Sequence, residues 1–366
     1  MKVFDNVLPN LEITYPINGD LPLEEFLFID IETTGFTAAH SELYLIGVIY
    51  YKETEFHLLQ WFAQSPQEEQ AILEEFLNFV EPYIHLVHFN GNQFDIPYLM
   101  NKCEQYQLSH SLGQKAGLDL YKQILPYKKF LKLTNCKQRT LEEYLSIDRT
   151  DVYNGGELID CYREYVEAPS DQQLNMLLLH NAEDVLGLLL LLPILAYADL
   201  TAEGAFSVKK VQANSHKDIN GVTRQELLIH ISVKQPLPVA ISSSKGGCYF
   251  SASDTSGYIK VPLLTKELKY FYANYGDYYY LPDEDVAIHK NLATYVNSKN
   301  RQKALASNCY TRKESKYLPQ YDTFVKPFFK ESYQSKELYF EMTDELKRER
   351  PFFVSYAAHI LEYLIL

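Results

Sequence analysis

The chain has 366 residues, 46% hydrophobic and 22% charged, which is enough for one large domain or two ordinary ones. Five scattered cysteines without a Cys-x-x-Cys pair argue against a disulfide framework or a zinc site. The sequence shows neither an apolar leader nor an apolar run long enough to span a bilayer. We therefore expect a cytoplasmic protein without a membrane partner. The net charge of −14 lies in residues 1–200, which hold 12 Lys and Arg against 30 Asp and Glu, whereas residues 201–366 carry a net of +4, which favours a nucleic-acid partner only if the basic residues cluster.

Residues 1–24 contain three prolines and a glycine and are predicted to be a loose lead-in. The sequence FLFIDIETTG, from Phe26 to Gly35, then predicts a buried strand that ends in a tight turn. Two strands, a helix, a fourth strand and a helix follow, over residues 43–51, 55–62, 66–80, 84–89 and 95–106. Short polar turns join the first three strands, so we expect them to pair antiparallel in an α/β mixed sheet flanked by helices.

From residue 118 the pattern is mainly helical, with helices predicted over residues 119–127, 140–145, 157–167 and 171–192. A polar, poorly patterned stretch places a domain boundary near residues 200–220, so we assign residues 25–203 to the first domain and 204–366 to a smaller β-rich α+β domain. Its predicted elements are strands over residues 225–233, 237–242, 247–251 and 257–263, a helix over 285–299 and an apolar helix over 352–366.

Asp30 and Glu32 are separated by one residue in the first predicted strand, so their side chains project to the same face and Ile31 to the other. Two carboxylates on an otherwise buried strand are costly unless positive charge neutralises them, and a hard divalent cation would do so. A solvated strand face explains this short pattern equally well, so it needs support from other carboxylates.

Asp95 stands where the fourth predicted strand passes into a helix. It could be an ordinary cap, because the N-terminus of a helix has unpaired N–H groups. If the fourth strand lies beside the first, however, Asp95 comes close to Asp30 and Glu32. Active sites of open α/β sheets collect at such strand ends.

His180 and Asp184 are four residues apart in the very apolar helix over 171–192 and therefore lie on one face of it. A buried histidine is more often a hydrogen-bonded core residue than a catalytic one, but the aspartate partner and the two other carboxylate sites favour a functional role. The neighbouring Glu183 projects about 100° away around the helix, which indicates a supporting or solvated residue.

The motifs DIETTG, NGNQFDIPYL and HNAEDVLGL, in this order, resemble the DEDD superfamily of 3′→5′ exonucleases, which has a ribonuclease-H-like fold. The second motif is similar to that of the proofreading domains of family B DNA polymerases. The third motif, and the segment Arg149–Thr150–Asp151 before Gly155, are similar to the YprB-type ribonuclease-H-like family. The resemblance covers roughly residues 25–200.

This resemblance implies that Asp30, Glu32, Asp95 and Asp184 bind two Mg²⁺ or Mn²⁺ ions and that His180 orients or deprotonates the attacking water. In the superfamily a histidine usually stands five residues before the last aspartate and a tyrosine four. Here His180 stands at the tyrosine spacing.

The function implied is that of a metal-dependent 3′→5′ exonuclease on the 3′ end of single-stranded DNA or RNA. The alternatives are a structure-specific endonuclease on the same site and a non-catalytic nucleic-acid-binding or scaffold protein. The basic residues and tyrosines of the second domain could form a track for single strands, although its aromatic residues 269–281 could equally be the core of that domain. The residues expected to contact substrate are Thr33, Phe36, Asn90, Phe94, Lys290, Arg301 and Lys303.

Overall fold

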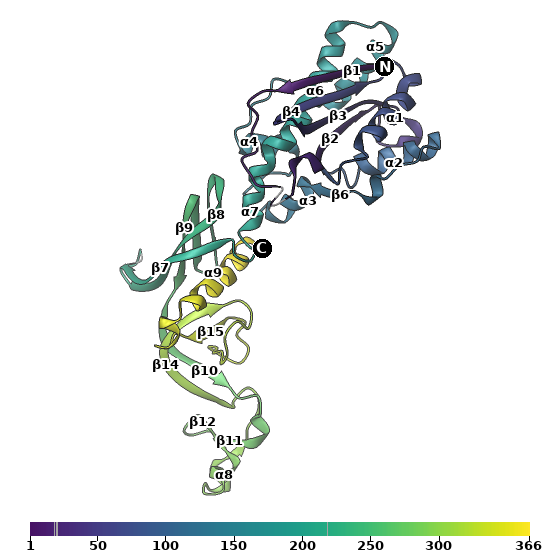
Figure 1. Cartoon of the computed structure of the whole chain (residues 1–366). Coiled ribbons are helices and arrows are strands. Elements are labelled where there is room, and N and C mark those ends of the chain that lie inside the picture. The colour runs from purple at the N-terminus through teal and green to yellow at the C-terminus, as the bar shows by residue number, and fades with distance from the viewer. Residues whose placement is uncertain (18, 20, 218) are drawn as a thin grey trace. The chain divides into compact units, whose positions relative to one another are not determined.

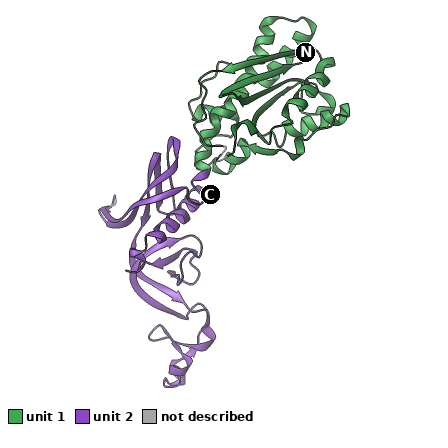
Figure 2. Cartoon of the chain, viewed as in Figure 1, with its two compact units in different colours: residues 1–198 green, residues 199–366 purple. Residues whose placement is uncertain are grey.

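The computed structural model describes residues 1–17, 19, 21–217 and 219–366. The chain divides into two compact units, Met1–Ala198 and Asp199–Leu366, which Figure 2 distinguishes by colour. The second unit begins at residue 199, whereas the boundary predicted from the sequence lies at residue 204. Each unit has its own sheets and its own buried core, and each is described by itself.

A six-stranded mixed sheet forms the centre of the N-terminal unit (Figure 1). The strands lie in the order β1-β4-β3-β2-β5-β6; the pairs from β1 to β2 are antiparallel, and β2, β5 and β6 are parallel. The predicted antiparallel meander and the predicted α/β class are therefore confirmed. The strands are β1 (Lys2–Leu8), β2 (Phe26–Thr33), β3 (Leu43–Lys52), β4 (Glu55–Phe62), β5 (His85–His88) and β6 (Ala116–Asp119).

Helices cover both faces of this sheet (Figure 1). On one face, α1 (Glu69–Val80) and α2 (Asp95–Tyr106) share a core cluster with Ile29 and Ile31 of β2. On the other face, α5 (Gly155–Glu167) and α6 (Asp171–Leu191) pack on Tyr44 of β3 and Phe62 of β4. The remaining helices before residue 200 are α3 (Leu120–Ile124), α4 (Gln138–Tyr144) and α7 (Ala196–Asp199).

The stretch Asp171–Asp199, which begins with α6, is by length and composition apolar enough to cross a membrane. Half of its most apolar part is buried inside the protein, and α6 contacts β2, β3 and β4. Its N-terminus is capped by Ser170, which accepts a hydrogen bond from the N–H of Gln173 at 3.3 Å. These contacts make α6 the central core helix of the N-terminal unit.

Two strands of the sheet differ from expectation. Lys2–Leu8, expected to be part of a loose lead-in, is the edge strand β1 and pairs with residues 56–62 of β4. Most of its side chains are exposed, so the pairing partner rather than a buried apolar face stabilises it. β6 is only four residues long and precedes α3 directly; the sequence predicted no strand there, and its helix over 119–127 begins where β6 ends.

The described residues of the C-terminal unit form three three-stranded antiparallel sheets, with the orders β7-β8-β9, β10-β14-β15 and β12-β11-β13, which confirms its β-rich character. The predicted apolar C-terminal helix is α9, which packs on the first of these sheets. The bounds are β7 (Phe206–Lys217), β8 (Thr223–Lys245), β9 (Cys248–Pro262), β10 (Leu264–Phe271), β11 (Tyr278–Leu281), β12 (Val286–His289), α8 (Lys290–Ala293), β13 (Gln302–Lys303), β14 (Tyr310–Gln320), β15 (Leu338–Glu341) and α9 (Arg350–Ile365).

Three predictions for this unit are wrong in detail. The strands predicted over 247–251 and 257–263 are one continuous strand, β9. The strands predicted over 225–233 and 237–242 are one continuous strand, β8, whose pairing with β9 shifts register between Ser232 and Ile241. Pro236 and Pro238 lie in that interval and lack the N–H groups that a regular ladder requires. The helix predicted over 285–299 is mostly absent, because 286–289 pairs with β11 as a strand and only 290–293 is α-helical.

Candidate active site

β2 places Asp30 and Glu32 on the face of the sheet that α6 covers. Because side chains alternate along a strand, Ile29 and Ile31 enter the core beneath α1 and α2 while the two carboxylates point the other way. Both acidic residues are partly exposed, and the pairing of β2 with β3 becomes irregular directly after Glu32. The carboxylates therefore lie at the end of the strand, where a substrate could reach them.

A buried amide from α6 holds Asp30 in place. Asn181 is fully buried, its Nδ2 donates to Asp30 Oδ2 at 3.0 Å, and its Oδ1 accepts from Gln60 Nε2 at 2.9 Å. Gly47 lies opposite Asp30 in the β2–β3 ladder, and a Cβ at this position would come within 1.9 Å of Asn181 Oδ1. The amide can reach Asp30 only because residue 47 is a glycine.

The third carboxylate belongs to Asp95, which is the first residue of α2 and is buried. A hydrogen bond with the backbone of Ile31 ties this carboxylate to β2. Burial raises the pKa of Asp95 to about 7, and repulsion from Asp119 and Asp184 adds to the shift. The parallel pairing of β5 with β2 explains this proximity, because it brings the start of α2 next to the end of β2.

The pKa values of Asp30 and Glu32 are also well above the usual range. Burial is the main cause for both residues, and repulsion from Asp184 is the next, with Asp95 contributing further. The hydrogen bond from Asn181 offsets part of the shift at Asp30. Among the described residues no lysine or arginine forms an ion pair with Asp30, Glu32 or Asp95, so this group of carboxylates lacks positive charge.

His180 and Asp184 project from α6 to the edge of the same group. His180 Nε2 lies 3.2 Å from Asp184 Oδ2 and 3.7 Å from Glu32 Oε1. Its other ring nitrogen, Nδ1, lies 2.7 Å from Oδ2 of Asp151, whose side chain is almost fully buried. A neutral imidazole with its proton on Nδ1 donates to Asp151 and presents the lone pair of Nε2 to the carboxylates. The four-residue spacing thus brings a histidine nitrogen to the site.

Arg149 was not predicted to be part of the site. Its guanidinium lies between α4 and α6, 2.6 Å from Asp184 Oδ1 and 3.1 Å from Glu142 Oε2, with Glu183 at 3.5 Å and Asp151 at 3.6 Å. Burial opposes its charged form, but the surrounding carboxylates outweigh that effect and raise the pKa of Arg149. The only indication of Arg149 in the sequence is the segment at 149–151, which supported the family resemblance but not a role in the site.

Glu183 supports the loop that carries Asp151. Its Oε1 accepts a hydrogen bond from the Thr150 N–H at 3.0 Å, and its Oε2 accepts one from the Asp151 N–H at the same distance. Burial opposes ionisation of this glutamate, but the hydrogen bonds from Thr150 and Asp151 outweigh it and lower the pKa of Glu183. The supporting role indicated by its position on the helix agrees with these contacts.

The donor set suits divalent cations. Glu32, His180 and Asp184 each offer one ligand atom, and these atoms lie within 4.8 Å of one another. Asp30 and Asp95 add two further carboxylates, and no lysine or arginine among the described residues forms an ion pair with either. Carboxylate oxygens are the ligands that Mg²⁺ and Mn²⁺ prefer, so residues of this chain fit such ions.

The predicted substrate contacts of the N-terminal unit lie on the turns around these carboxylates. Phe36 is 92% exposed, and its ring lies edge-on to Phe94 with 6.1 Å between ring centroids. Thr33 is the last residue of β2, and its hydroxyl donates to the backbone of the following turn. Asn90 has a φ of 60°, and its N–H donates to Asp119 Oδ1 at 2.9 Å, which fixes the loop before α2.

The other predicted contacts, Lys290, Arg301 and Lys303, belong to the C-terminal unit. Lys290 forms an ion pair with Asp277 at 2.7 Å, and the Arg301 guanidinium lies 5.0 Å from the centre of the Tyr279 ring. Lys303 lies in β13 opposite Tyr279 and is exposed. Tyr272 packs against Tyr270 and Tyr278, so part of the aromatic surface expected to bind bases is occupied by packing within the unit.

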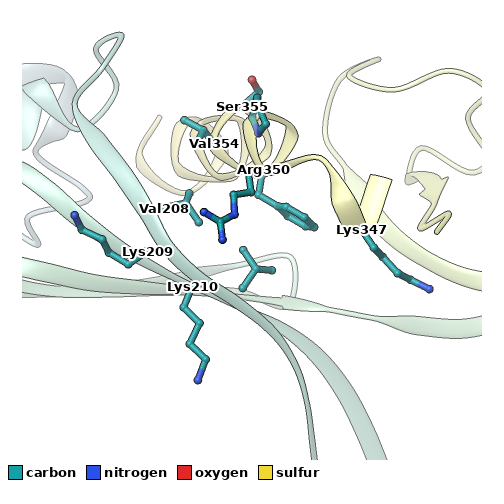
Figure 3. A pocket seen from close by; sticks show the side chains of 10 residues that line it. Val208, Lys209, Lys210, Lys347, Arg350, Val354 and Ser355 are labelled. Carbon is teal, nitrogen blue, oxygen red and sulfur yellow. The ribbon is translucent and has the colours of Figure 1, made fainter. Parts of the chain in front are cut away.

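A hollow of about 760 Å³ is lined by residues of β7 and α9 in the C-terminal unit (Figure 3). Figure 3 shows Arg350 pointing into it, with Lys209 and Lys347 extending outward on either side. Lys347 pairs with Asp344 at 2.7 Å, whereas Arg350 and Lys209 have no acidic partner among the described residues. The lining holds no carboxylate and no histidine, so this hollow offers cationic surface rather than a reactive site.

Comparisons with solved structures find distant likenesses. A family B DNA polymerase from Pyrobaculum calidifontis aligns with 50% of this chain and 26% of its own, at 16% identity and a TM-score of 0.40. Exonuclease I of E. coli, in a zinc-bound complex with single-stranded DNA, aligns with 58% of this chain and 55% of its own, at 12% identity and a TM-score of 0.31. The chain thus spans little more than half of the exonuclease and about a quarter of the polymerase. No curated protein sequence matches the chain.

A protein-family model gives the decisive comparison. The model RNase_H_2, described as RNase_H superfamily, matches residues 27–196. This range begins in β2, ends at the first residue of α7, and contains every carboxylate of the site. It agrees with the mixed sheet and with the resemblance that the three motifs carry. Residues 27–196 therefore form a ribonuclease-H-like domain of the RNase_H superfamily.

Proposed function

We propose that the chain is a metal-dependent 3′→5′ exonuclease that hydrolyses phosphodiester bonds of single-stranded DNA or RNA. The observation that carries this proposal is the convergence of Asp30, Glu32, Asp95 and Asp184 at one end of β2 with no lysine or arginine beside the first three. Such a group repels an anionic phosphate unless divalent cations neutralise it. The motif resemblance to DEDD exonucleases supports the polarity of the reaction.

Two Mg²⁺ or Mn²⁺ ions on these carboxylates would supply the charge that activates a water and stabilises the leaving 3′ oxygen. His180 Nε2, oriented through Nδ1 by Asp151, stands where it can accept the proton of that water. A bond then forms between the water oxygen and phosphorus, the bond to the 3′ oxygen breaks, and that oxygen takes a proton from solvent. The product is a nucleoside 5′-monophosphate.

Arg149 has a positioning role in this proposal. It holds Asp184 Oδ1 at 2.6 Å, which leaves Asp184 Oδ2 turned towards His180 Nε2. A carboxylate fixed by one arginine presents its second oxygen in a defined direction, and this is what a metal ligand needs.

The test is the turnover of 5′-labelled single-stranded oligonucleotides, as DNA and as RNA, in Mn²⁺, Mg²⁺ or EDTA. We expect a metal-dependent ladder of shortening products that disappears in Asp30→Asn. The matched control is Asp160→Asn, because the Asp160 side chain is 74% exposed and belongs to a surface ion pair. A single discrete cut would instead favour an endonuclease, and binding without cleavage would favour a nucleic-acid-binding protein.

A further inference from the structure

A pocket of about 560 Å³ lies next to the carboxylate site in the N-terminal unit. Asn90 and Gln93, on its wall, belong to the loop that leads into Asp95. Gln138, also on its wall, donates from Nε2 to the backbone oxygen of Asp184 at 2.8 Å. The pocket therefore adjoins the segments that carry two of the four carboxylates, and its volume is within the range of small-ligand sites.

One part of the pocket wall is aromatic and apolar. Phe89 and Tyr121 meet edge to face with 5.8 Å between ring centroids, and Leu125 beside them is 45% exposed. Exposed aromatic surface in a pocket is suited to stacking against a nucleobase, because every base has a flat π-face.

The other part of the wall is basic, in a unit that is otherwise acidic. Lys128 and Lys137 line the pocket, and neither ammonium group has an ion-pair partner among the residues that the structure describes. Five of the 12 Lys and Arg of residues 1–200 fall within residues 122–137, a stretch without any Asp or Glu. Unpaired cations beside an apolar wall are the combination that binds a phosphate together with its base.

The segment that carries Lys137 is held in place from within. Asn135 Oδ1 accepts hydrogen bonds from the Lys137 N–H at 2.9 Å and from the Thr140 hydroxyl at 2.8 Å. Gln138 Nε2 is shared between the Asp184 backbone oxygen and Glu142 Oε1. A pocket whose rim is already ordered loses less conformational entropy when a ligand binds.

We propose that this pocket binds the nucleotide adjoining the scissile phosphate, with its base against Phe89 and Tyr121 and its phosphate between Lys128 and Lys137. This inference rests on the proposed function, since it assigns the place of one nucleotide of the strand that the carboxylate site cleaves.

The test measures binding of 5′-fluorescein-labelled octamers of thymidylate and of uridylate by anisotropy over a series of KCl concentrations. The full chain carries Asp30→Asn to prevent cleavage. The pocket variant is Lys128→Met with Lys137→Met. Its matched control is Lys129→Met with Lys132→Met, which removes the same charge from the same segment at exposed residues outside the pocket.

We expect the pocket variant to reduce the slope of log K against log[salt] by about 1.4, because each phosphate contact on a single strand contributes about 0.7. The control pair should change the slope much less. Tyr121→Ala should weaken binding roughly 5- to 150-fold, the loss measured for one stacked base, and Tyr121→Phe should restore it. Equal slopes for both lysine pairs would overturn the pocket assignment, because the overall positive charge of the segment, and not the pocket, would then determine the salt dependence of binding.

A parallel cleavage assay in the chain with Asp30 intact separates this inference from the proposed function. If the chain cleaves the strand but the pocket variants bind it as tightly as the control variant does, the pocket assignment is refuted and the proposed function stands. If the chain cleaves no strand but the pocket variants still lose affinity, the proposed exonuclease activity is refuted and the assignment of a nucleotide-binding pocket stands. Urea unfolding followed by the fluorescence of Trp61, the single tryptophan, verifies that each variant is folded.

Discussion

Replacing Gly47 by alanine should disturb the candidate active site through a neighbouring strand. A Cβ on this residue would lie 1.9 Å from Oδ1 and 2.9 Å from Nδ2 of Asn181, and real Cβ atoms essentially never approach other atoms within 3.0 Å. Asn181 is fully buried and is bonded at one end to Asp30 and at the other to Gln60. The amide therefore has to give up these hydrogen bonds to make room for the methyl group.

The magnitude follows from the bonds lost. The hydrogen bond to the ionisable Asp30 contributes about 1.5–3 kcal/mol and the one to Gln60 about 0.5–1.5 kcal/mol, so Gly47→Ala should reduce the free energy of unfolding by roughly 2–4.5 kcal/mol. The matched control is Gly113→Ala, whose Cβ would meet only Met100 Cε at an ordinary 3.7 Å. The control should change stability by no more than about 1 kcal/mol.

The assay is urea unfolding followed by tryptophan fluorescence. Trp61 is the only tryptophan and is buried in β4, so its signal reports unfolding of the N-terminal unit. A double-mutant cycle with Asn181→Ala tests the mechanism, because removing the amide removes the clash. The double variant should be less destabilised than the sum of the single variants. Additive effects, or a Gly47→Ala variant as stable as the Gly113→Ala control, would refute the reasoning.

Three further predictions concern charge and exposure. The pKa of Asp95 in the folded protein, about 7, exceeds the usual unfolded value of about 3.9, so the metal-free protein should lose stability as pH rises from about 4 to 7. The Tm measured across this range should vary less in Asp95→Asn than in the parent chain. Addition of Mn²⁺ should restore the Tm of the parent chain at pH 8. Asp151→Asn should lower kcat about 10²- to 10⁴-fold and leave Mn²⁺ affinity in calorimetry unchanged, because it acts through His180 as the proton acceptor and contacts none of the four carboxylates proposed to bind the metal. Phe36→Ala should leave the unfolding midpoint unchanged and weaken oligonucleotide binding, because the side chain is 92% exposed.

Each of these predictions has a result that contradicts it. A pH dependence of Tm that is the same in Asp95→Asn as in the parent chain would show that another group titrates. A loss of Mn²⁺ affinity in Asp151→Asn would show that this residue shapes the metal site rather than His180. A large drop in the unfolding midpoint of Phe36→Ala would assign the ring to packing against Phe94 instead of substrate.

The sequence predicted which acidic residues share a face at the site, because the local periodicity of strands and helices determines this. The period of two along a strand places Asp30 and Glu32 together, and the period of a helix places His180 and Asp184 together. The position of Asp95 needed one further assumption, that the fourth predicted strand lies beside the first, and the parallel pairing of β5 with β2 confirms it.

What the sequence did not predict depends on partners far along the chain. Arg149 meets Asp184 across 35 residues, and Asn181 meets Gln60 across 121, so no local pattern marks either contact. The edge strand at residues 2–8 has few buried side chains of its own and exists because β4 offers it a partner. The predicted helix over 285–299 failed for the same reason, since pairing with β11 overrides helical periodicity.

The distribution of charge around the site also bears on the order in which its ligands bind. Arg149 contacts Asp184, whereas Asp30, Glu32 and Asp95 have no lysine or arginine beside them among the described residues. A polyanionic strand would meet strong repulsion there, and the acidic N-terminal unit as a whole adds to it. Under the proposed function, we therefore expect divalent cations to bind before the strand or together with it. Under the same proposal, a strand that arrives first needs cations outside the carboxylate group, and Lys128 and Lys137 of the adjoining pocket, which have no ion-pair partner among the described residues, are candidates.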